Sequence, residues 1–137
     1  MRERLYTMST RERERIRDMV AAELAGEPAV AFAYLYGSFR EAEKFHDVDI
    51  GVYLCAVEPN QVSGPALSQR LSARVRLPVD VRILNGAPVS FLYHVLRGQL
   101  VLSNDDNLLA GVIEHTVSCY LDIAPLLRHS AKEAFAA

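Results

Sequence analysis

Apolar positions along the chain follow two spacings, one typical of helices and one typical of buried strands. Ser9 and Glu12 have capping-box spacing in front of a helix-favouring stretch, so we expect an N-terminal helix over residues 9–25. The charged run from Arg11 to Arg17 alternates in sign, which is typical of a solvated helix face. The apolar stripe of this helix consists of residues three or four positions apart, namely Ile16, Met19, Val20 and Leu24.

Four short apolar runs predict the strands of a sheet. Residues 29–36 are continuously apolar, with aromatic and β-branched members, as in a strand that is buried on both faces. Residues 48–54 and 79–84 predict a second and a third strand, and residues 100–103 a short fourth one. Together these runs predict a mixed four-stranded sheet.

Helices are expected between these strands. A short helix from Ser38 to about Glu43 follows the first strand, and residues 59–66 are expected to form a loop. Two more helices are predicted, one through Leu67, Leu71 and Val75 and one from Pro88 to Gly98. Asp105 or Asp106 would cap a C-terminal helix over residues 105–130, which Pro125 should kink or interrupt.

The expected fold class is therefore α/β, with helices covering the sheet. We expect a single domain over residues 1–137, made of the N-terminal helix, a core over residues 29–103 and the C-terminal helix.

Composition narrows the function classes. Half of the 137 residues are apolar and the net charge is −2, which argues against disorder and against a dedicated nucleic-acid binder. No apolar stretch approaches the ~18 residues that cross a bilayer, and the N-terminus has no signal-peptide pattern, so we expect a cytoplasmic protein. Cys55 and Cys119 are predicted to be buried free thiols.

The chemistry concentrates around the second predicted strand. Gly37-Ser38 follows a buried strand and precedes a short helix, a place where backbone amides can bind phosphate, although such a dipeptide is more often only a capped turn. Asp47 and Asp49 are two positions apart, so both carboxylates point to one side of a strand and can share a divalent cation such as Mg²⁺. Asp80 would join them if the third strand lies beside the second.

These motifs carry a family resemblance. Gly37-Ser38, Asp47-Val48-Asp49 and the later Asp80 resemble the signature of the polymerase-beta-like nucleotidyltransferase superfamily. Within that superfamily, the chain looks like the minimal nucleotidyltransferases, the MNT antitoxins that are encoded beside HEPN-domain toxins. The resemblance covers roughly residues 30–103 and, more loosely, the last helix. It implies a single nucleotidyltransferase domain.

The resemblance also implies an activity. Asp47, Asp49 and Asp80 would be the catalytic residues and the Mg²⁺ ligands, and Gly37, Ser38 and Arg40 would bind the nucleotide. The implied reaction is the transfer of AMP from ATP to a tyrosine hydroxyl of a partner HEPN-domain RNase toxin, which silences the toxin. Direct binding of nucleic acid or membrane is not expected, and a homo-oligomer is possible.

Two features depart from the family pattern and keep alternatives open. The spacer between Ser38 and Asp47 has eight residues, fewer than is usual in the family, and Arg40-Glu41 stands where an Arg-Gly is common. A nucleotidyltransferase fold that neutralises its toxin by binding alone is therefore the main alternative. An antibiotic-modifying nucleotidyltransferase is a weaker one, because those enzymes usually carry a further domain. Arg82 shares a strand face with Asp80 and is expected to pair with Asp49 in a salt bridge or to contact a phosphate.

Overall fold

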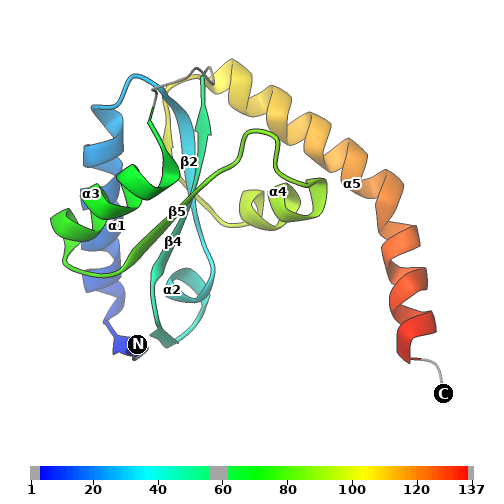
Figure 1. Ribbon diagram of the computed structural model, residues 1–137, viewed down its shortest axis with the longest axis horizontal. Coiled ribbons are helices and arrows are strands. Elements are labelled where there is room, and N and C mark those ends of the chain that lie inside the picture. Colours follow the sequence, from blue (N-terminus) through cyan, green and yellow to red (C-terminus); the bar gives the residue numbers. More distant parts are fainter. Residues whose placement is uncertain (1–3, 56–61, 136–137) are drawn as a thin grey trace.

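The fold is built on the predicted mixed sheet of four strands. The computed structural model describes residues 4–55 and 62–135 (Figure 1). The strand order is β5-β4-β2-β6; β2 is antiparallel to both of its neighbours, and β4 and β5 are parallel. The strands are β2 (Val30–Tyr36), β4 (Val48–Leu54), β5 (Val79–Ile83) and β6 (Gln99–Ser103).

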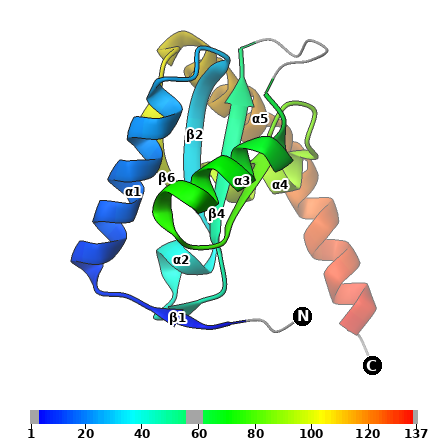
Figure 2. The same cartoon turned by 60° about the vertical axis from the view of Figure 1, so that its left-hand side comes forward.

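Helices cover both faces of this sheet, as predicted. Figure 2 shows α1 (Thr10–Ala25) and α3 (Gly64–Val75) side by side in front of the sheet, with α4 and α5 behind it. The second pair comprises α4 (Val89–Leu96) and α5 (Asp106–Phe135). The short helix α2 (Ser38–Glu41) connects β2 to the segment that precedes β4.

Two hydrophobic cores result from this layering. The strand β2 is buried along its whole length, and from Phe32 to Tyr36 its side chains alternate between the cores. Leu35, together with Val48 and Ile50 of β4, belongs to the core beneath α1 and α3. Tyr34 and Tyr36 belong to the core beneath α4 and α5. Asp49, between Val48 and Ile50, therefore points to the α4 face of the sheet.

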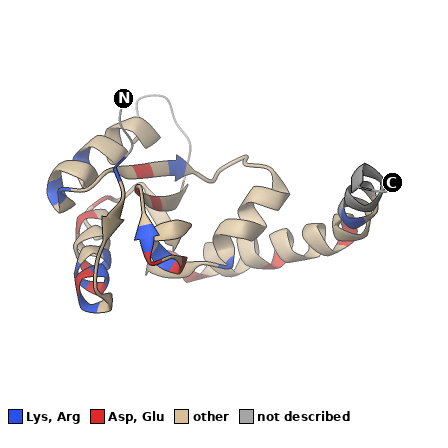
Figure 3. Cartoon of the chain, turned by 90° about the horizontal axis from the view of Figure 1, so that it is seen from below, with Lys and Arg blue, Asp and Glu red and all other residues tan. Residues whose placement is uncertain are grey.

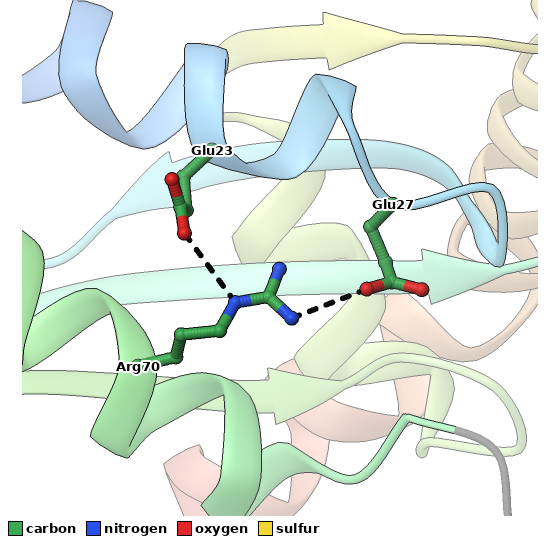
Figure 4. Close-up of polar contacts among 3 residues, drawn as sticks. All are labelled: Glu23, Glu27 and Arg70. Carbon is green, nitrogen blue, oxygen red and sulfur yellow. Dashed lines mark hydrogen bonds and ion pairs between the residues drawn. The ribbon is translucent and has the colours of Figure 1, made fainter.

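Polar contacts fix α3 against its neighbours. In Figure 4, the Arg70 guanidinium lies between Glu23 and Glu27, at 3.5 and 3.2 Å, and so connects α3 to the C-terminal end of α1. The hydroxyls of Ser72 and Ser68 accept hydrogen bonds from the amides of Val79 and Val81, at 2.9 and 2.8 Å. These two bonds hold the outer edge of β5 on both sides of Asp80.

Three details of the predicted fold are wrong. A second small sheet, in which β1 (Tyr6–Thr7) pairs with β3 (Lys44–Phe45), was not expected, because strands of two residues carry no alternating pattern. The expected loop over residues 59–66 lies partly outside the described residues, and α3 already begins at Gly64, where Ser63 caps it. Both cysteines are free as predicted, but neither is fully buried: Cys55, just beyond the end of β4, is exposed, and Cys119 is half-buried.

Of the two outcomes expected at Pro125, a kink or an interruption of the C-terminal helix, the interruption does not occur. Asp105 caps the helix through the Leu108 amide, at 3.0 Å, and α5 continues through Pro125 without interruption. Leu121, four positions before the proline, is 64% exposed, so water can reach the carbonyl that a proline leaves unpaired. In Figure 1 the helix axis changes direction in its orange part. Among the described residues, none of the helices has the length and apolar character needed to span a bilayer.

Candidate active site

The three predicted acids converge at one end of the sheet. Asp49 and Asp80 are direct neighbours in the register of the parallel strands β4 and β5, and Asp47 lies just before β4. One carboxylate oxygen from each of these residues lies within 4.8 Å of the others, and all three side chains are partly exposed. The expectation that Asp80 reaches the other two acids is thereby confirmed.

Gly37 lies directly against this cluster. Its φ of 82° falls in the region that only glycine adopts readily, and it stands between the end of β2 and the first turn of α2. A Cβ atom at this position would collide with the Asp49 carboxylate. The glycine therefore allows the Gly37-Ser38 turn and the acid cluster to approach each other closely.

Electrostatic repulsion within the cluster is large. Burial, together with the charge of Asp47, a hydrogen bond to Asp47 and the charge of Asp80, raises the pKa of Asp49 to about 7. Arg82 acts in the opposite direction, since its charge favours the ionised carboxylate. Burial and the nearby Asp49 charge also raise the pKa of the Tyr36 hydroxyl to about 12. The cluster thus holds more negative charge than its protein surroundings balance.

This charge imbalance fits a divalent cation. Three carboxylates with converging oxygens form the hard donor set that Mg²⁺ prefers, and their partial exposure leaves room for water or substrate oxygens. A cation bound there would favour the ionised form of Asp49 and so oppose the burial and the repulsion that raise its pKa. Asp47, Asp49 and Asp80 are therefore the residues that can hold such an ion.

Aromatic side chains and one arginine border the cluster on the α4 side. The Tyr36 ring packs edge-on against Phe91 and His94 of α4, each with ring centroids 5.8 Å apart. Arg82 forms the expected salt bridge, but with Asp80, at 3.4 Å, and not with Asp49; its guanidinium lies 5.7 Å from the centre of the Phe91 ring. These groups give the acid cluster a wall with an apolar part and a cationic part.

The predicted nucleotide-binding residues do not all lie together. Gly37 and Ser38 adjoin the cluster, because they directly follow Tyr36, and Tyr36 and Asp49 are the last paired residues of β2 and β4 at this end of the sheet. Arg40 instead pairs with Glu41 at 3.4 Å and lines a cavity of about 490 Å³ together with Arg17 of α1. Leu35, from the core beneath α1, lines the same cavity. Arg40 thus lies towards the sheet face opposite to the acids.

Arg13, which lines the same cavity as Arg40, contacts the segment between the two motifs and was not identified by the sequence analysis. The run from Arg11 to Arg17 was expected to be solvated, but Arg13 is partly buried and its guanidinium contacts the segment between Ser38 and Asp47. Its position could have been found from helical spacing, since Arg13 lies three and seven positions before Ile16 and Val20 of the buried stripe.

Comparison with known proteins agrees with this fold. Residues 19–107 match the family described as Polymerase beta, Nucleotidyltransferase. No curated protein matches the chain at a significant level. Among solved structures, one of tri-AMPylated Shewanella oneidensis HEPN toxin in complex with MNT antitoxin contains a similar chain, with a TM-score of 0.68 and 18% identity over 90% of this chain and 99% of that one.

Two further solved structures have the same fold. A toxin–antitoxin structure with AMP-PNP has a TM-score of 0.69 and 18% identity, covering 88% of this chain and 98% of that one. A structure of the toxin–antitoxin MntA-HepT has a TM-score of 0.63 and 17% identity, covering 93% and 100% of the two chains. The family match spans well over half of the sequence and includes the Gly-Ser turn and all three acids. The chain therefore belongs to the polymerase beta nucleotidyltransferase family.

Proposed function

We propose that this protein is an ATP- and Mg²⁺-dependent nucleotidyltransferase that transfers AMP to a tyrosine hydroxyl of a HEPN-domain toxin and so acts as its antitoxin. The observation that carries the proposal is the convergence of Asp47, Asp49 and Asp80 within 4.8 Å of one another beside Gly37. The similarity to chains from HEPN–MNT complexes, one of them with an AMPylated toxin, supports the choice of partner and reaction.

Each residue of the cluster has a role in this proposal. Asp47 and Asp49 would hold Mg²⁺, and Asp80 would complete the ligand set or accept the proton of the attacking hydroxyl. When bound, Mg²⁺ supplies charge neutralisation on the phosphates of ATP. Gly37 and Ser38 would contact the outer phosphates through the turn before α2. The bond between the acceptor oxygen and the α-phosphorus forms while the bond to pyrophosphate breaks.

The surface of the molecule supports a protein as the acceptor. The acid cluster is partly exposed at the end of the sheet, so a side chain from another molecule can approach it. Leu121 and Leu126 of α5 are 64% and 67% exposed, and Figure 3 shows that this helix, which leads to the C-terminal mark, carries few charged residues. These two side chains leave apolar surface of α5 open to contact with a partner protein.

The test uses label position and a matched variant. The protein is incubated with Mg²⁺, a HEPN-domain protein encoded by the neighbouring gene, and ATP labelled at either the α- or the γ-phosphate. We expect label on a tyrosine of the partner from α-labelled ATP only, and none with Asp49→Asn. Equal labelling by the Asp49→Asn protein would contradict the proposal.

A second function is neutralisation of the toxin by binding alone. The eight-residue spacer and the position of Arg40, which is paired with Glu41, favour this alternative. In the same experiment, it predicts a tight complex in which the partner carries no label and its RNase activity is still blocked. The Asp49→Asn protein would then inhibit the toxin as well as the unaltered protein does.

A further inference from the structure

Among the described residues, Arg13 makes more side-chain contacts with backbone carbonyls near the site than any of the predicted site residues does. It donates hydrogen bonds to the carbonyls of Phe39, Ala42 and Glu43, that of Ala42 at 2.7 Å, and to the carbonyl of Met8 at 3.1 Å. It also lies 5.6 and 5.0 Å from the ring centres of Phe39 and Phe45, two phenylalanines that are at most 1% exposed. Arg13 therefore joins α1 to both ends of the segment between Ser38 and β3.

This segment cannot hold its conformation by itself. The helix α2 has only four residues, and a helix of one turn gains too few hydrogen bonds to form alone in water. Its C-terminal carbonyls lack partners within the helix, and a cation at a helix C-terminus is favoured by the helix dipole. The planar guanidinium, with five donors, can serve several carbonyls at once, which an ammonium group cannot do with the same geometry.

The segment matters because it connects the two halves of the site. Gly37 and Ser38 stand at one end of it, and Asp47 follows its other end after β3. We propose that Arg13 is a positioning residue that sets the placement of Asp47 relative to the Gly37-Ser38 turn. This inference rests on the proposed function, and it gives a physical account of how a spacer of only eight residues brings the two motifs together.

The test compares Arg13→Ala with Arg17→Ala. Arg17 lies one turn further along α1, lines the same cavity and is paired with Asp18 on its own helix, so it is the matched control. We expect Arg13→Ala to weaken Mn²⁺ binding and to lower kcat/KM for ATP by about tenfold to a hundredfold, the loss expected from a displacement near 1 Å. Hydrogen exchange should accelerate at residues 39–47, and millimolar methylguanidinium should restore activity. Arg17→Ala should change none of these properties.

Several outcomes separate this inference from the function on which it rests. If the unaltered protein transfers no AMP, the proposed enzymatic function fails, and Mn²⁺ affinity together with exchange at residues 39–47 still decides the role of Arg13. If Arg13→Ala does not fold, Arg13→Lys replaces it in the same measurements. We expect partial losses, because one ammonium group cannot contact the carbonyls of Phe39, Ala42 and Glu43 with the geometry of the guanidinium. A variant with a lower melting temperature but unchanged Mn²⁺ affinity, exchange and KM would overturn the inference.

Discussion

At the scale of single residues, the contact between Gly37 and Asp49 limits what the site tolerates. Gly37 follows the last residue of β2, Tyr36, which pairs with Asp49 of β4. The turn after Tyr36 has no space for a side chain, because the Asp49 carboxylate occupies the position that a Cβ atom would need. The glycine of the Gly-Ser motif is therefore required by its own acid cluster, independently of any bound phosphate.

Replacing this glycine should affect stability and metal binding together. We expect Gly37→Ala to lower the free energy of unfolding by about 1–3 kcal/mol, since φ is 82° and ψ is −162°, a combination that L-residues avoid. It should also weaken Mn²⁺ binding by displacing Asp49. Chemical denaturation and metal titration measure the two effects. Gly86→Ala is the control, because that glycine also has positive φ but faces open space. Loss of stability with normal Mn²⁺ affinity would refute the steric link to Asp49.

The raised pKa of Asp49 gives the metal-free protein a pH signature. The folded chain keeps the proton of Asp49 up to about pH 7, whereas the unfolded chain releases it near its ordinary pKa of 3.8. This carboxyl therefore stabilises the metal-free fold at low pH, and its contribution is lost as pH rises from about 4 to about 7. This part of the pH dependence of the free energy of unfolding should disappear in Asp49→Asn.

Denaturation of both proteins without metal, at intervals between pH 4 and pH 8, isolates this contribution as the difference between them. The variant should become the more stable of the two above about pH 7. A difference that does not depend on pH would show that Asp49 is ionised throughout.

The acids and the glycine could be identified from the sequence, but Arg13 could not be assigned its contacts. Two aspartates at alternate positions face the same way on any strand, and Asp80 follows if the strands are adjacent. Arg13, by contrast, binds backbone carbonyls of a segment that is 26 to 30 positions away. Carbonyl acceptors have no sequence signature, so only the packing of α1 against α2 reveals this contact.

At the scale of elements, the close packing of α4 on the sheet depends on Gly51 in the middle of β4. A Cβ atom there would lie 2.7 Å from Val95 of α4 and 3.1 Å from Leu84. Because Asp49 and Gly51 lie on the same face of the strand, the glycine brings α4, with its Phe91 and His94, next to the acids.

A double substitution tests this packing. We expect Gly51→Ala to destabilise the protein by about 1–3 kcal/mol through overpacking. Val95→Ala alone should also destabilise it, because Val95 is fully buried. The double variant should be more stable than the sum of the two predicts, since each change makes room for the other. Strictly additive effects in urea denaturation would show that the two residues do not compete for space.

Long apolar runs made most of the elements predictable. The run of β2 and the stripe of α1 are strong periodic signals, and both lie where they were expected. The pairing of β1 with β3 was missed because it depends on contacts between Tyr6 and Phe45, whose rings stack with centroids 5.7 Å apart. Such short strands are defined by tertiary packing and not by local pattern.

At the scale of the whole molecule, the acid cluster exists only in the folded state. Asp80 is far in the sequence from Asp47 and Asp49, and it joins them through the parallel pairing of β4 with β5. A cation that binds all three carboxylates should therefore bind the folded chain in preference to the unfolded one, and metal binding should be coupled to folding.

Thermal unfolding at pH 8 measures this coupling. At a Mn²⁺ or Mg²⁺ concentration a hundred times the dissociation constant, we expect a stabilisation of about 2.7 kcal/mol and a matching rise in melting temperature. Asp80→Asn should reduce the rise, because it removes one of the three ligands. A control with monovalent salt at the same ionic strength accounts for general screening of charges. An equal rise in the Asp80→Asn protein would place the metal elsewhere.

The two serine hydroxyls of α3 that hold β5 also bear on self-association. An outermost strand normally offers free amides to which another polypeptide can add. Here the amides of Val79 and Val81 are already engaged by Ser72 and Ser68, so a second copy could extend the sheet at β5 only by displacing α3. The border of the sheet next to Asp80 is thereby protected from strand addition and stays accessible for chemistry.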